Sequence, residues 1–523
     1  MPVRDEARAQ VAEPAARDRR RLPRHVLIAV AALLVAGTGL RAWALASAAG
    51  AFDSDSAVPA LMARQILRGD LPVFYWGQPY GGSLESLVSA ALFAVLPPWV
   101  FIVKLVPMLF CAAAAALTWR IGRRLVGPEA AALAAAVFWV VPFTVWYSTK
   151  SGPYWASLAC ALLSVLLLLR LADAERPPWW EAGALGLALG LAWWSNLSVL
   201  LIVPVAVLFL GGRLVRHWKL SWAVAGGFVA GAAPWIAYNL RHDWASLNIG
   251  AGQLESTYTG RLRGFFTTAL PLAMGLRRTF THEWLLGPIG PLLYLAALGG
   301  FVVFAVRAAR GSDRRLWLLG GVVAVYPFVY AASPFTWYVA QPRYVLYLLP
   351  FLALLAGRAA AGSPARAAVG VVLIVVIAVV GIARFPTDEP KAAGAVVPVG
   401  TSEIHHLLRD HGITHAYSDY WIAYRLTFES RERTIVAPIA LWRYQPYQDE
   451  VAAAPRPAYI FLSDSPSLPQ FLAAATTRSV PVDVFTEGRW TVAVPHAKVL
   501  PGDWPEAFGC PVQCAPSWSS WPS

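Results

Sequence analysis

Two carboxylates stand out because they lie in the segment FDSDSAVPALMARQILRGD (52–70), just after the first apolar run of the chain. Asp53 and Asp55 fall where a membrane span would end, and charged groups at that depth are costly and usually functional. A partly desolvated aspartate there can serve as general base for a hydroxyl acceptor. One residue of the group could instead cap the following helix, and Ser54, Asp55 and Ser56 all suit that role.

The next segment, LPVFYWGQPYGGSLES (71–86), combines aromatic rings with polar groups and glycines. Trp and Tyr at this depth commonly anchor a protein at the membrane interface. Aromatic faces beside an amide and a carboxylate also suit sugar hydroxyls, which makes Gln78, Tyr80 and Glu85 candidate substrate contacts. The glycines would let the backbone bend closely around a ligand.

Isolated cations at the outer ends of spans form a third group. Lys150 in WYSTKSGPY and Arg343 in AQPRYVLYLLP both run against the usual placement of positive charge. Lysine often extends to the interface as a surface anchor, whereas arginine pairs well with phosphate oxygens. We expect Lys150, Arg343 and Arg64 to contact substrate. Further outer cations that could neutralise an anionic lipid head are Arg261, Arg263, Arg277 and Arg278.

Metal and redox chemistry have weaker signals. In the tail, His411 and His415 are spaced like ligands one helical turn apart, but no acidic signature accompanies them, so no metal is predicted. Cys510 and Cys514 in CPVQC could form a disulfide on the outer side of a membrane. The sequence has no Walker loop, dinucleotide fingerprint or G-x-S-x-G elbow. No cofactor is therefore expected, and a divalent cation is possible without being indicated.

The composition is that of a membrane protein. Of 523 residues, 57% are hydrophobic and only 14% are charged, with a mean hydropathy of +0.52. A soluble protein of this length would need a more charged surface. The net charge of +13 comes from basic residues in short loops between apolar runs. The positive-inside rule explains them, so a nucleic-acid partner is not expected.

Apolar length and charge together predict the topology. We expect about eleven spans, at roughly 26–48, 99–120, 129–147, 154–171, 179–195, 197–212, 219–239, 288–307, 315–333, 343–358 and 366–384. The stretch 82–98 is short and ends in two prolines, so we expect it to lie in the interface. Counting it as a span would move every basic cluster outside the cytoplasm. The N-terminus is thus predicted inside, and the C-terminal region outside.

Three parts follow from this topology. A basic cytoplasmic tail (1–25) precedes a transmembrane domain (26–384) with large outer loops at 50–98 and 240–287. The tail from 385 to 523 has alternating stretches such as AYIFLSD (458–464), and it contains a helix-like pattern in SEIHHLLRDHGI. We expect an outward-facing α/β domain there.

The outer-loop sequence, from FDSDSAVPALMARQILRGD through VFIVKLVPML, resembles the first outer loop of glycosyltransferase family 39-like proteins. These are GT-C-fold membrane enzymes related to protein O-mannosyltransferases and to the lipid A aminoarabinose transferase. The resemblance continues through RIGRRLVGPEAAALAAAVFWVVPFTVWYSTKSGPY and the later PRY. The family's first-loop Asp, usually part of an Asp-Glu pair, matches Asp55. Here Ser56 replaces the Glu that usually follows, and the second acid is the preceding Asp53.

The resemblance implies a glycosyltransferase that uses a polyprenyl-phosphate-sugar donor on the outer face of the inner (cytoplasmic) membrane. Asp55 would be the base and Asp53 an auxiliary, while Lys150 and Arg343 would stabilise the leaving phosphate. The acceptor could be a lipid, a glycan or a protein. Two alternatives stay open. One is a transporter or flippase for lipid-linked glycans. The other is a non-catalytic scaffold in envelope assembly, which the missing Glu favours.

Overall fold

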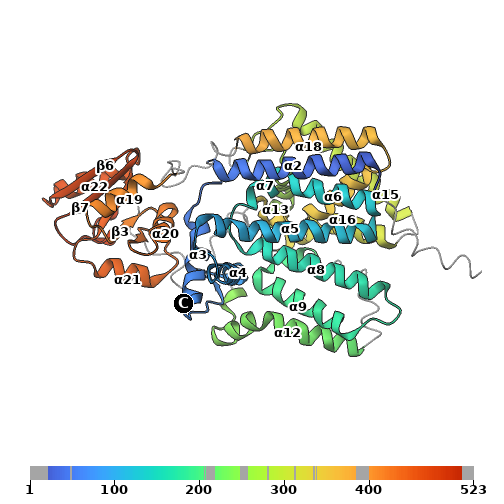
Figure 1. Cartoon of the computed structure of the whole chain (residues 1–523), viewed down its shortest axis with the longest axis horizontal. Coiled ribbons are helices and arrows are strands. Elements are labelled where there is room, and N and C mark those ends of the chain that lie inside the picture. Colours follow the sequence, from blue (N-terminus) through green and yellow to red (C-terminus); the bar gives the residue numbers. More distant parts are fainter. Residues whose placement is uncertain are drawn as a thin grey trace, which may run out of the picture.

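The structure, a computed structural model, describes residues 22–47, 50–204, 207, 218–247, 257–278, 282–310, 314–333, 336, 339–384 and 400–508. Within these ranges the chain forms a helical bundle and a smaller α/β domain, which lie at opposite ends of the long axis (Figure 1). Most of the basic N-terminal tail lies outside the described residues. So do both cysteines of the CPVQC motif, Cys510 and Cys514.

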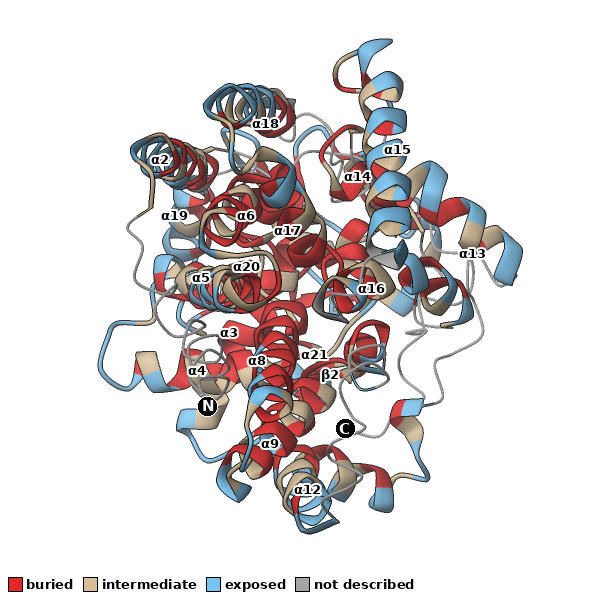
Figure 2. Ribbon diagram, turned by 90° about the vertical axis from the view of Figure 1, so that its right-hand side faces the viewer, coloured by how far each residue is buried: buried red, intermediate tan, exposed pale blue. Residues whose placement is uncertain are grey.

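Six helices in the described ranges are long and apolar enough to cross a bilayer, which confirms a polytopic helical membrane protein. Several of them expose apolar side chains along one face, as lipid-facing helices do. Figure 2 shows many exposed residues along α2, α15 and α18, whereas α8 is buried at the centre. The six are α2 (Arg24–Ala46), α5 (Val100–Leu125), α8 (Pro153–Asp173), α12 (Trp218–Arg241), α15 (Ile289–Arg310) and α18 (Pro364–Arg384).

Shorter helices complete the bundle, and the predicted count of about eleven spans stays a prediction. The expected span 197–212 starts with a 3-10 turn, η3, and continues largely outside the described residues. The shorter elements are α6 (Pro128–Val140), α7 (Pro142–Tyr147), α9 (Trp179–Ser195), η3 (Leu197–Leu201), η4 (Ala245–Leu247), α13 (Tyr258–Gly264), η5 (Phe265–Ala269), α14 (Leu270–Ala273), α16 (Arg314–Ala332), η7 (Pro342–Val345) and α17 (Leu349–Ala360).

The expected single span 129–147 is broken into α6 and α7. Val141 has an extended backbone (φ −51°, ψ 131°), and Pro142 begins the next helix. A proline lacks the N–H for helix continuation and disfavours helical geometry at the preceding residue. After this break, α7 ends at Tyr147, three residues before Lys150.

A buried arginine, Arg41 in α2, secures this broken helix. Its side chain is 1% exposed and donates to Ser148 Oγ (2.9 Å) and to the backbone oxygen of Trp139 (2.7 Å). It also lies 3.7 Å from the Trp139 ring. A charge inside an apolar bundle is tolerated only when its donors are satisfied. Because these partners flank the α6–α7 break, Arg41 fixes the segment that precedes Lys150.

The bundle and the α/β domain meet at residues 50–98, the segment predicted to be the first outer loop. This loop forms α3 (Ser54–Leu67), the hairpin of β1 (Phe74–Tyr75) and β2 (Gln78–Gly82), and α4 (Leu84–Phe93). The 10 residues of α4 span about 15 Å, too short to cross the hydrocarbon core. Its length agrees with the expected interfacial helix. In Figure 1, α3 and α4 lie between the bundle and the orange-red domain.

The C-terminal region forms the expected α/β domain. Its five-stranded sheet has the order β4-β3-β5-β7-β6, with β3, β4 and β5 parallel and β7 antiparallel to β5 and β6. The alternating stretch 458–464 becomes β5, and Gly412 (φ +64°) follows the helix of SEIHHLLRDHGI. The elements are α19 (Ser402–Asp410), β3 (His415–Ser418), α20 (Tyr420–Glu429), β4 (Ile435–Pro438), α21 (Gln445–Ala453), β5 (Ala458–Leu462), α22 (Ser467–Thr477), β6 (Val482–Glu487), β7 (Trp490–Pro495), η9 (Pro501–Asp503) and η10 (Pro505–Phe508).

Candidate active site

The two acidic residues of the outer loop have different environments. Asp53 is the N-cap of α3: its Oδ1 accepts from the N–H of Ser56 at 3.0 Å. The expectation that a residue of this group caps the helix is confirmed, but the cap is Asp53 and not Ser54, Asp55 or Ser56, since the helix already begins at Ser54. The Oδ2 of Asp53 forms an ion pair with Lys150 at 3.0 Å, and both side chains are nearly buried. Asp53 is thus already engaged in holding the helix start.

Asp55, two residues later, is the more accessible carboxylate, with 44% of its side chain exposed. Its Oδ1 accepts from Nη2 of Arg443 at 2.7 Å and from the hydroxyl of Tyr420 at 2.5 Å. Both partners belong to the α/β domain. Within the described part of the chain all hydrogen bonds of this carboxylate reach Oδ1, so Oδ2 is available to a ligand.

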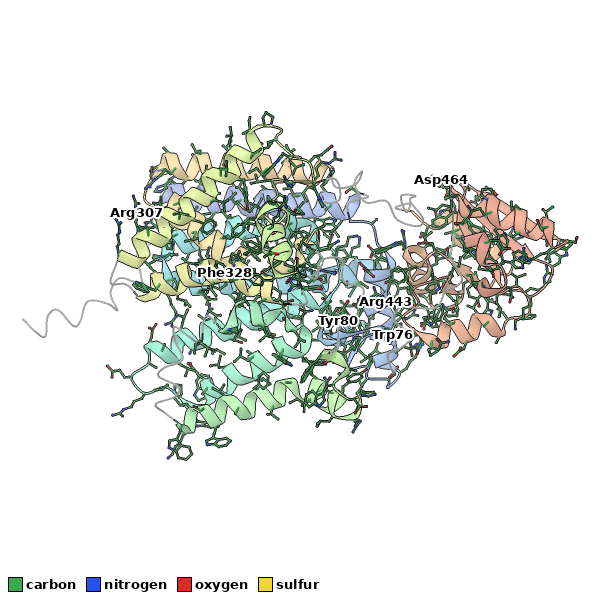
Figure 3. The ribbon with its side chains drawn as sticks, turned by 180° about the vertical axis from the view of Figure 1, so that it is seen from behind. Trp76, Tyr80, Arg307, Phe328, Arg443 and Asp464 are labelled. Carbon is green, nitrogen blue, oxygen red and sulfur yellow. The ribbon has the colours of Figure 1, made fainter. Side chains whose placement is uncertain are left out.

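Arg443 sits between the hairpin of the outer loop and the α/β domain, as Figure 3 shows beside Trp76 and Tyr80. With the amide of Gln78 oriented to face it, the Gln78 oxygen accepts from both Nη atoms of Arg443 at 3.0 Å. Gln78 was expected to contact sugar or acceptor, and here it holds an arginine beside the candidate base. A role for Gln78 in binding substrate stays a prediction.

Tyr80 joins this cluster to Arg343. Burial raises the pKa of the Tyr80 hydroxyl, and the charges of Arg343 and Arg443 oppose that shift. Arg343 in turn interacts with a group of hydroxyls and lies 5.1 Å from the ring of Tyr344 and 5.5 Å from that of Tyr154. It forms no ion pair with a carboxylate in the described residues, and its buried Nε has no hydrogen-bond partner there. Arg343 can therefore receive an anion.

Glu85 lies in the first turn of α4 and is 1% exposed. Its Oε2 accepts from the N–H of Gly152 at 3.2 Å. Burial raises the pKa of Glu85 to about 8, against the opposing effect of Gly152 and Ser151. The carboxyl group is therefore mainly protonated at neutral pH and able to donate a hydrogen bond.

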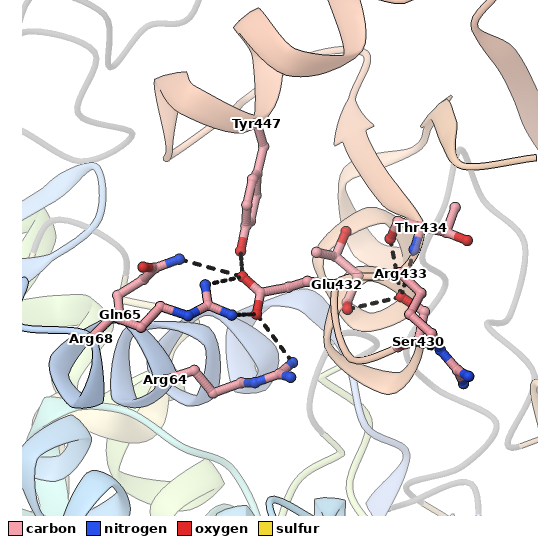
Figure 4. Close-up of polar contacts among 9 residues, drawn as sticks. Arg64, Gln65, Arg68, Ser430, Glu432, Arg433, Thr434 and Tyr447 are labelled. Carbon is pink, nitrogen blue, oxygen red and sulfur yellow. Dashed lines mark hydrogen bonds and ion pairs between the residues drawn. The ribbon is translucent and has the colours of Figure 1, made fainter.

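Arg64 lies away from Asp55, at the other end of α3. Together with Arg68 it pairs with Glu432 of the α/β domain, at 3.4 and 2.7 Å respectively (Figure 4). Tyr447 donates to the same carboxylate at 2.7 Å. The backbone of Glu432 has φ +60°, a conformation that non-glycine residues adopt rarely. The structure thus gives Arg64 a role in joining the two domains, and its expected contact with substrate stays a prediction.

Sequence reasoning missed the contribution of the α/β domain, namely Arg443 and Tyr420. The segment LWRYQPY around Arg443 is rich in aromatic residues, and an arginine within it was the one available signal. It also missed Lys104 in α5, which is 6% exposed and donates to the backbone oxygen of Gly50. That bond holds the chain immediately before α3.

The expected helical pairing of His411 and His415 is wrong. α19 ends at Asp410, so His411 follows the helix and stacks on Phe485, whereas His415 begins β3. The intervening Gly412 ends the helix in the left-handed conformation. In the described ranges no group of three or more His, Cys, Asp or Glu side chains is arranged to hold a metal ion.

Comparisons of sequence support the resemblance noted above. Residues 86–238 match the family model described as dolichyl-phosphate-mannose-protein mannosyltransferase. Over 266 residues the chain is 25% identical to lipid A galacturonosyltransferase RgtD of Rhizobium johnstonii, in an alignment that covers 48% of this chain and 52% of the relative. The chain thus spans about half the length of the curated relative that it matches.

Comparisons of structure cover nearly the whole chain. ArnT from Cupriavidus metallidurans, bound to undecaprenyl phosphate, aligns with a TM-score of 0.57 at 12% identity, over 90% of this chain and 97% of that one. The oligosaccharyltransferase of Archaeoglobus fulgidus aligns with a TM-score of 0.50 at 12% identity, over 86% of this chain and 71% of that one. These similarities confirm the resemblance to GT-C-fold glycosyltransferases, and they show that the chain has this fold.

Proposed function

We propose that this chain is a membrane glycosyltransferase that transfers a sugar from a polyprenyl-phosphate donor to an acceptor hydroxyl. The observation that carries the proposal is the pairing of two groups around Tyr80. One is the half-exposed carboxylate of Asp55, and the other is the Arg343 guanidinium, which has no carboxylate partner in the described residues. A base and an anion-binding cation that both interact with the same tyrosine are suited to this transfer. The GT-C fold of ArnT, solved with undecaprenyl phosphate, supports the same class of donor.

The proposed step has one proton transfer and one displacement. Oδ2 of Asp55 accepts the proton of the acceptor hydroxyl as its oxygen bonds to the anomeric carbon. The bond between that carbon and the phosphate oxygen breaks, and the phosphate leaves with the electron pair. Arg343 stabilises the charge that develops on the phosphate, an effect that is strong in a site shielded from water. Lys150 is the weaker candidate for this role, because Asp53 already neutralises it.

We place the reaction at the outer face of the cytoplasmic membrane, with the N-terminus inside and the α/β domain outside. The distribution of basic residues in the short loops supports this orientation. For the acceptor we favour a membrane lipid, since the relative RgtD is named for its action on lipid A. Glycan and protein are the competing acceptor classes, and the labelling experiment distinguishes them from a lipid.

The test is transfer of radiolabelled sugar from a panel of polyprenyl-phosphate sugars in membranes that contain the wild type, Asp55→Asn or Asp70→Asn. Asp70 is exposed in the same loop and lies outside the site, so Asp70→Asn serves as the control that removes one negative charge without touching the candidate base. We expect the wild type and Asp70→Asn to label a lipid fraction and Asp55→Asn to be at least about 100-fold slower. Full activity of a normally folded Asp55→Asn protein would remove Asp55 as base. Label confined to glycan or protein would change the acceptor.

A further inference from the structure

The described hydrogen bonds of the Asp55 carboxylate all come from the α/β domain, and both end on the same oxygen. A carboxylate tied through Oδ1 in this way cannot rotate freely, so Oδ2 keeps a defined direction. On the basis of the proposed function, we propose that Arg443 and Tyr420 are positioning residues of the active site. They hold Oδ1 of Asp55 and thereby present Oδ2 to the acceptor hydroxyl.

Arg443 is itself fixed at its backbone. The N–H groups of Arg443 and Tyr444 both donate to the hydroxyl of Tyr424, at 2.7 and 3.1 Å. Tyr424 is fully buried in α20, the helix that packs against α3. Its hydroxyl therefore ties the Arg443 segment to the same helix that carries Tyr420. Both donors to Asp55 are thus parts of one rigid unit.

The outer loop confines the Arg443 side chain from the opposite direction. Gln78 accepts from both Nη atoms, and Trp76 stacks on Tyr444 with ring centroids 3.8 Å apart. Between them Gly77, at φ +65°, lies so close that an added Cβ would stand 3.2 Å from Cγ of Arg443. The Arg443 guanidinium thus lies between Asp55 and Gln78, and the Arg443 side chain is only 14% exposed. Arg443 is therefore held in one position, unlike the side chains of an exposed ion pair, which are solvated and contribute little.

The α/β domain forms ion pairs with both ends of α3, and comparing the two ends distinguishes a positioning role of Arg443 from a contribution to docking alone. If Arg443 served only to attach the α/β domain, its contribution would resemble that of Glu432, which pairs with Arg64 and Arg68 at the far end of the helix. Glu432 touches neither Asp55 nor its partners in the described contacts. It therefore provides a matched control that weakens docking and leaves the candidate base in place.

The experiment measures kcat and KM for donor and acceptor in Arg443→Gln, Arg443→Lys, Tyr420→Phe and Glu432→Gln. Size-exclusion profile and thermal unfolding check that each variant is folded. We expect Arg443→Gln to lower kcat about 100-fold with KM nearly unchanged, since small displacements of a catalytic group have effects of this size. Tyr420→Phe, which removes one bond, should lose about 10-fold, and Arg443→Lys should recover part of the loss. Glu432→Gln should keep kcat within about threefold.

A double variant decides whether Arg443 acts through Asp55. In an Asp55→Asn background, Arg443→Gln should cause no further loss of kcat, because residues that act as a unit are non-additive. A further loss, a rise in KM alone, or an equal effect of Glu432→Gln would each overturn the proposal. If the wild type transfers no sugar, the proposed function fails and this inference with it. Transfer by the wild type that Arg443→Gln leaves intact overturns only the inference.

Discussion

Oδ1 of Asp55 lies 2.7 Å from Nη2 of Arg443, although 388 positions separate the two residues in the chain. One belongs to the loop after the first membrane span and the other to the C-terminal α/β domain. A domain that the sequence presents as an appendage therefore contacts the candidate base directly.

Asp53 and Asp55 should respond oppositely to the same substitution. Asp53→Asn keeps a good N-cap residue but removes the charge opposite Lys150, and leaving a nearly buried cation unpaired costs about 3 kcal/mol. We expect a clear loss of thermal stability that the second change Lys150→Met largely restores. Asp55→Asn should lose less stability, because the Gln78 oxygen still accepts from both Nη atoms of Arg443, and it should slow transfer at least about 100-fold. An unstable Asp55→Asn protein with a stable Asp53→Asn counterpart would reverse the assignment.

Arg343 should matter for the donor more than for the fold. Arg343→Gln removes the charge that we place against the leaving phosphate, and we expect kcat to fall about 100- to 1,000-fold. Arg343→Lys should retain part of the rate, because lysine keeps the charge but not the planar fork. Steady-state kinetics with varied donor check this. Arg409→Gln, on an exposed part of α19, is the control for loss of a positive charge. Equal rates in Arg343→Gln and Arg409→Gln would exclude the role.

The junction at Glu432 should depend on pH. Burial alone would raise the pKa of Glu432, but hydrogen bonds from Arg68 and Tyr447 and the charge of Arg64 outweigh it and hold the pKa below the ordinary 4.5. The stabilisation is therefore present above the ordinary pKa and is lost as the pH falls through the lowered one. Because Arg68 is half-exposed, we expect only about 1 kcal/mol at neutral pH.

Melting temperatures of wild type and Glu432→Gln, measured between pH 7 and pH 3, test this dependence. The wild type should be more stable at neutral pH, and the difference should shrink as the pH falls below the ordinary pKa of 4.5. A difference that stays constant over this range would show that the ionised form of Glu432 does not contribute to joining the domains.

Gly77 should be needed to keep Arg443 in place. Gly77→Ala introduces strain at φ +65° and a Cβ only 3.2 Å from the Arg443 side chain. Gly412, at φ +64°, has nothing within 4 Å of its added Cβ, so Gly412→Ala isolates the cost of the backbone, about 1 kcal/mol. We expect both variants to lose similar stability but only Gly77→Ala to lose kcat, by about 10-fold. Kinetics and thermal unfolding of the pair measure the difference, and equal kcat values would contradict the prediction.

The fold follows largely from local patterns in the sequence. Long apolar runs give the membrane helices, and the alternation in AYIFLSD becomes β5 in the interior of the C-terminal sheet. The break at Pro142 was missed because hydropathy averages across it, although the proline rule alone would have predicted it. His415 was misplaced because the helical pattern was extended past Gly412, where the helix has already ended.

The candidate site follows from the sequence only in part. Asp55, Gln78, Tyr80 and Arg343 were singled out for their residue types and their places at span ends, and the structure brings them into one neighbourhood. Arg443 could not be found in this way. Its partner lies in another domain, and no periodicity or spacing records a contact between a membrane loop and the loop after β4.

The ion pairs along α3 also favour one direction of docking between this helix and the α/β domain. The helix is negative at its start, through Asp55, and positive at its end, through Arg64 and Arg68, an order that agrees with the helix dipole. The facing domain presents the complement, with Arg443 opposite the start and Glu432 opposite the end. Docking in the reversed direction would set arginine against arginine and carboxylate against carboxylate, which like-charge repulsion disfavours. The same contacts that touch the candidate base thus also reject the wrong assembly of the two halves.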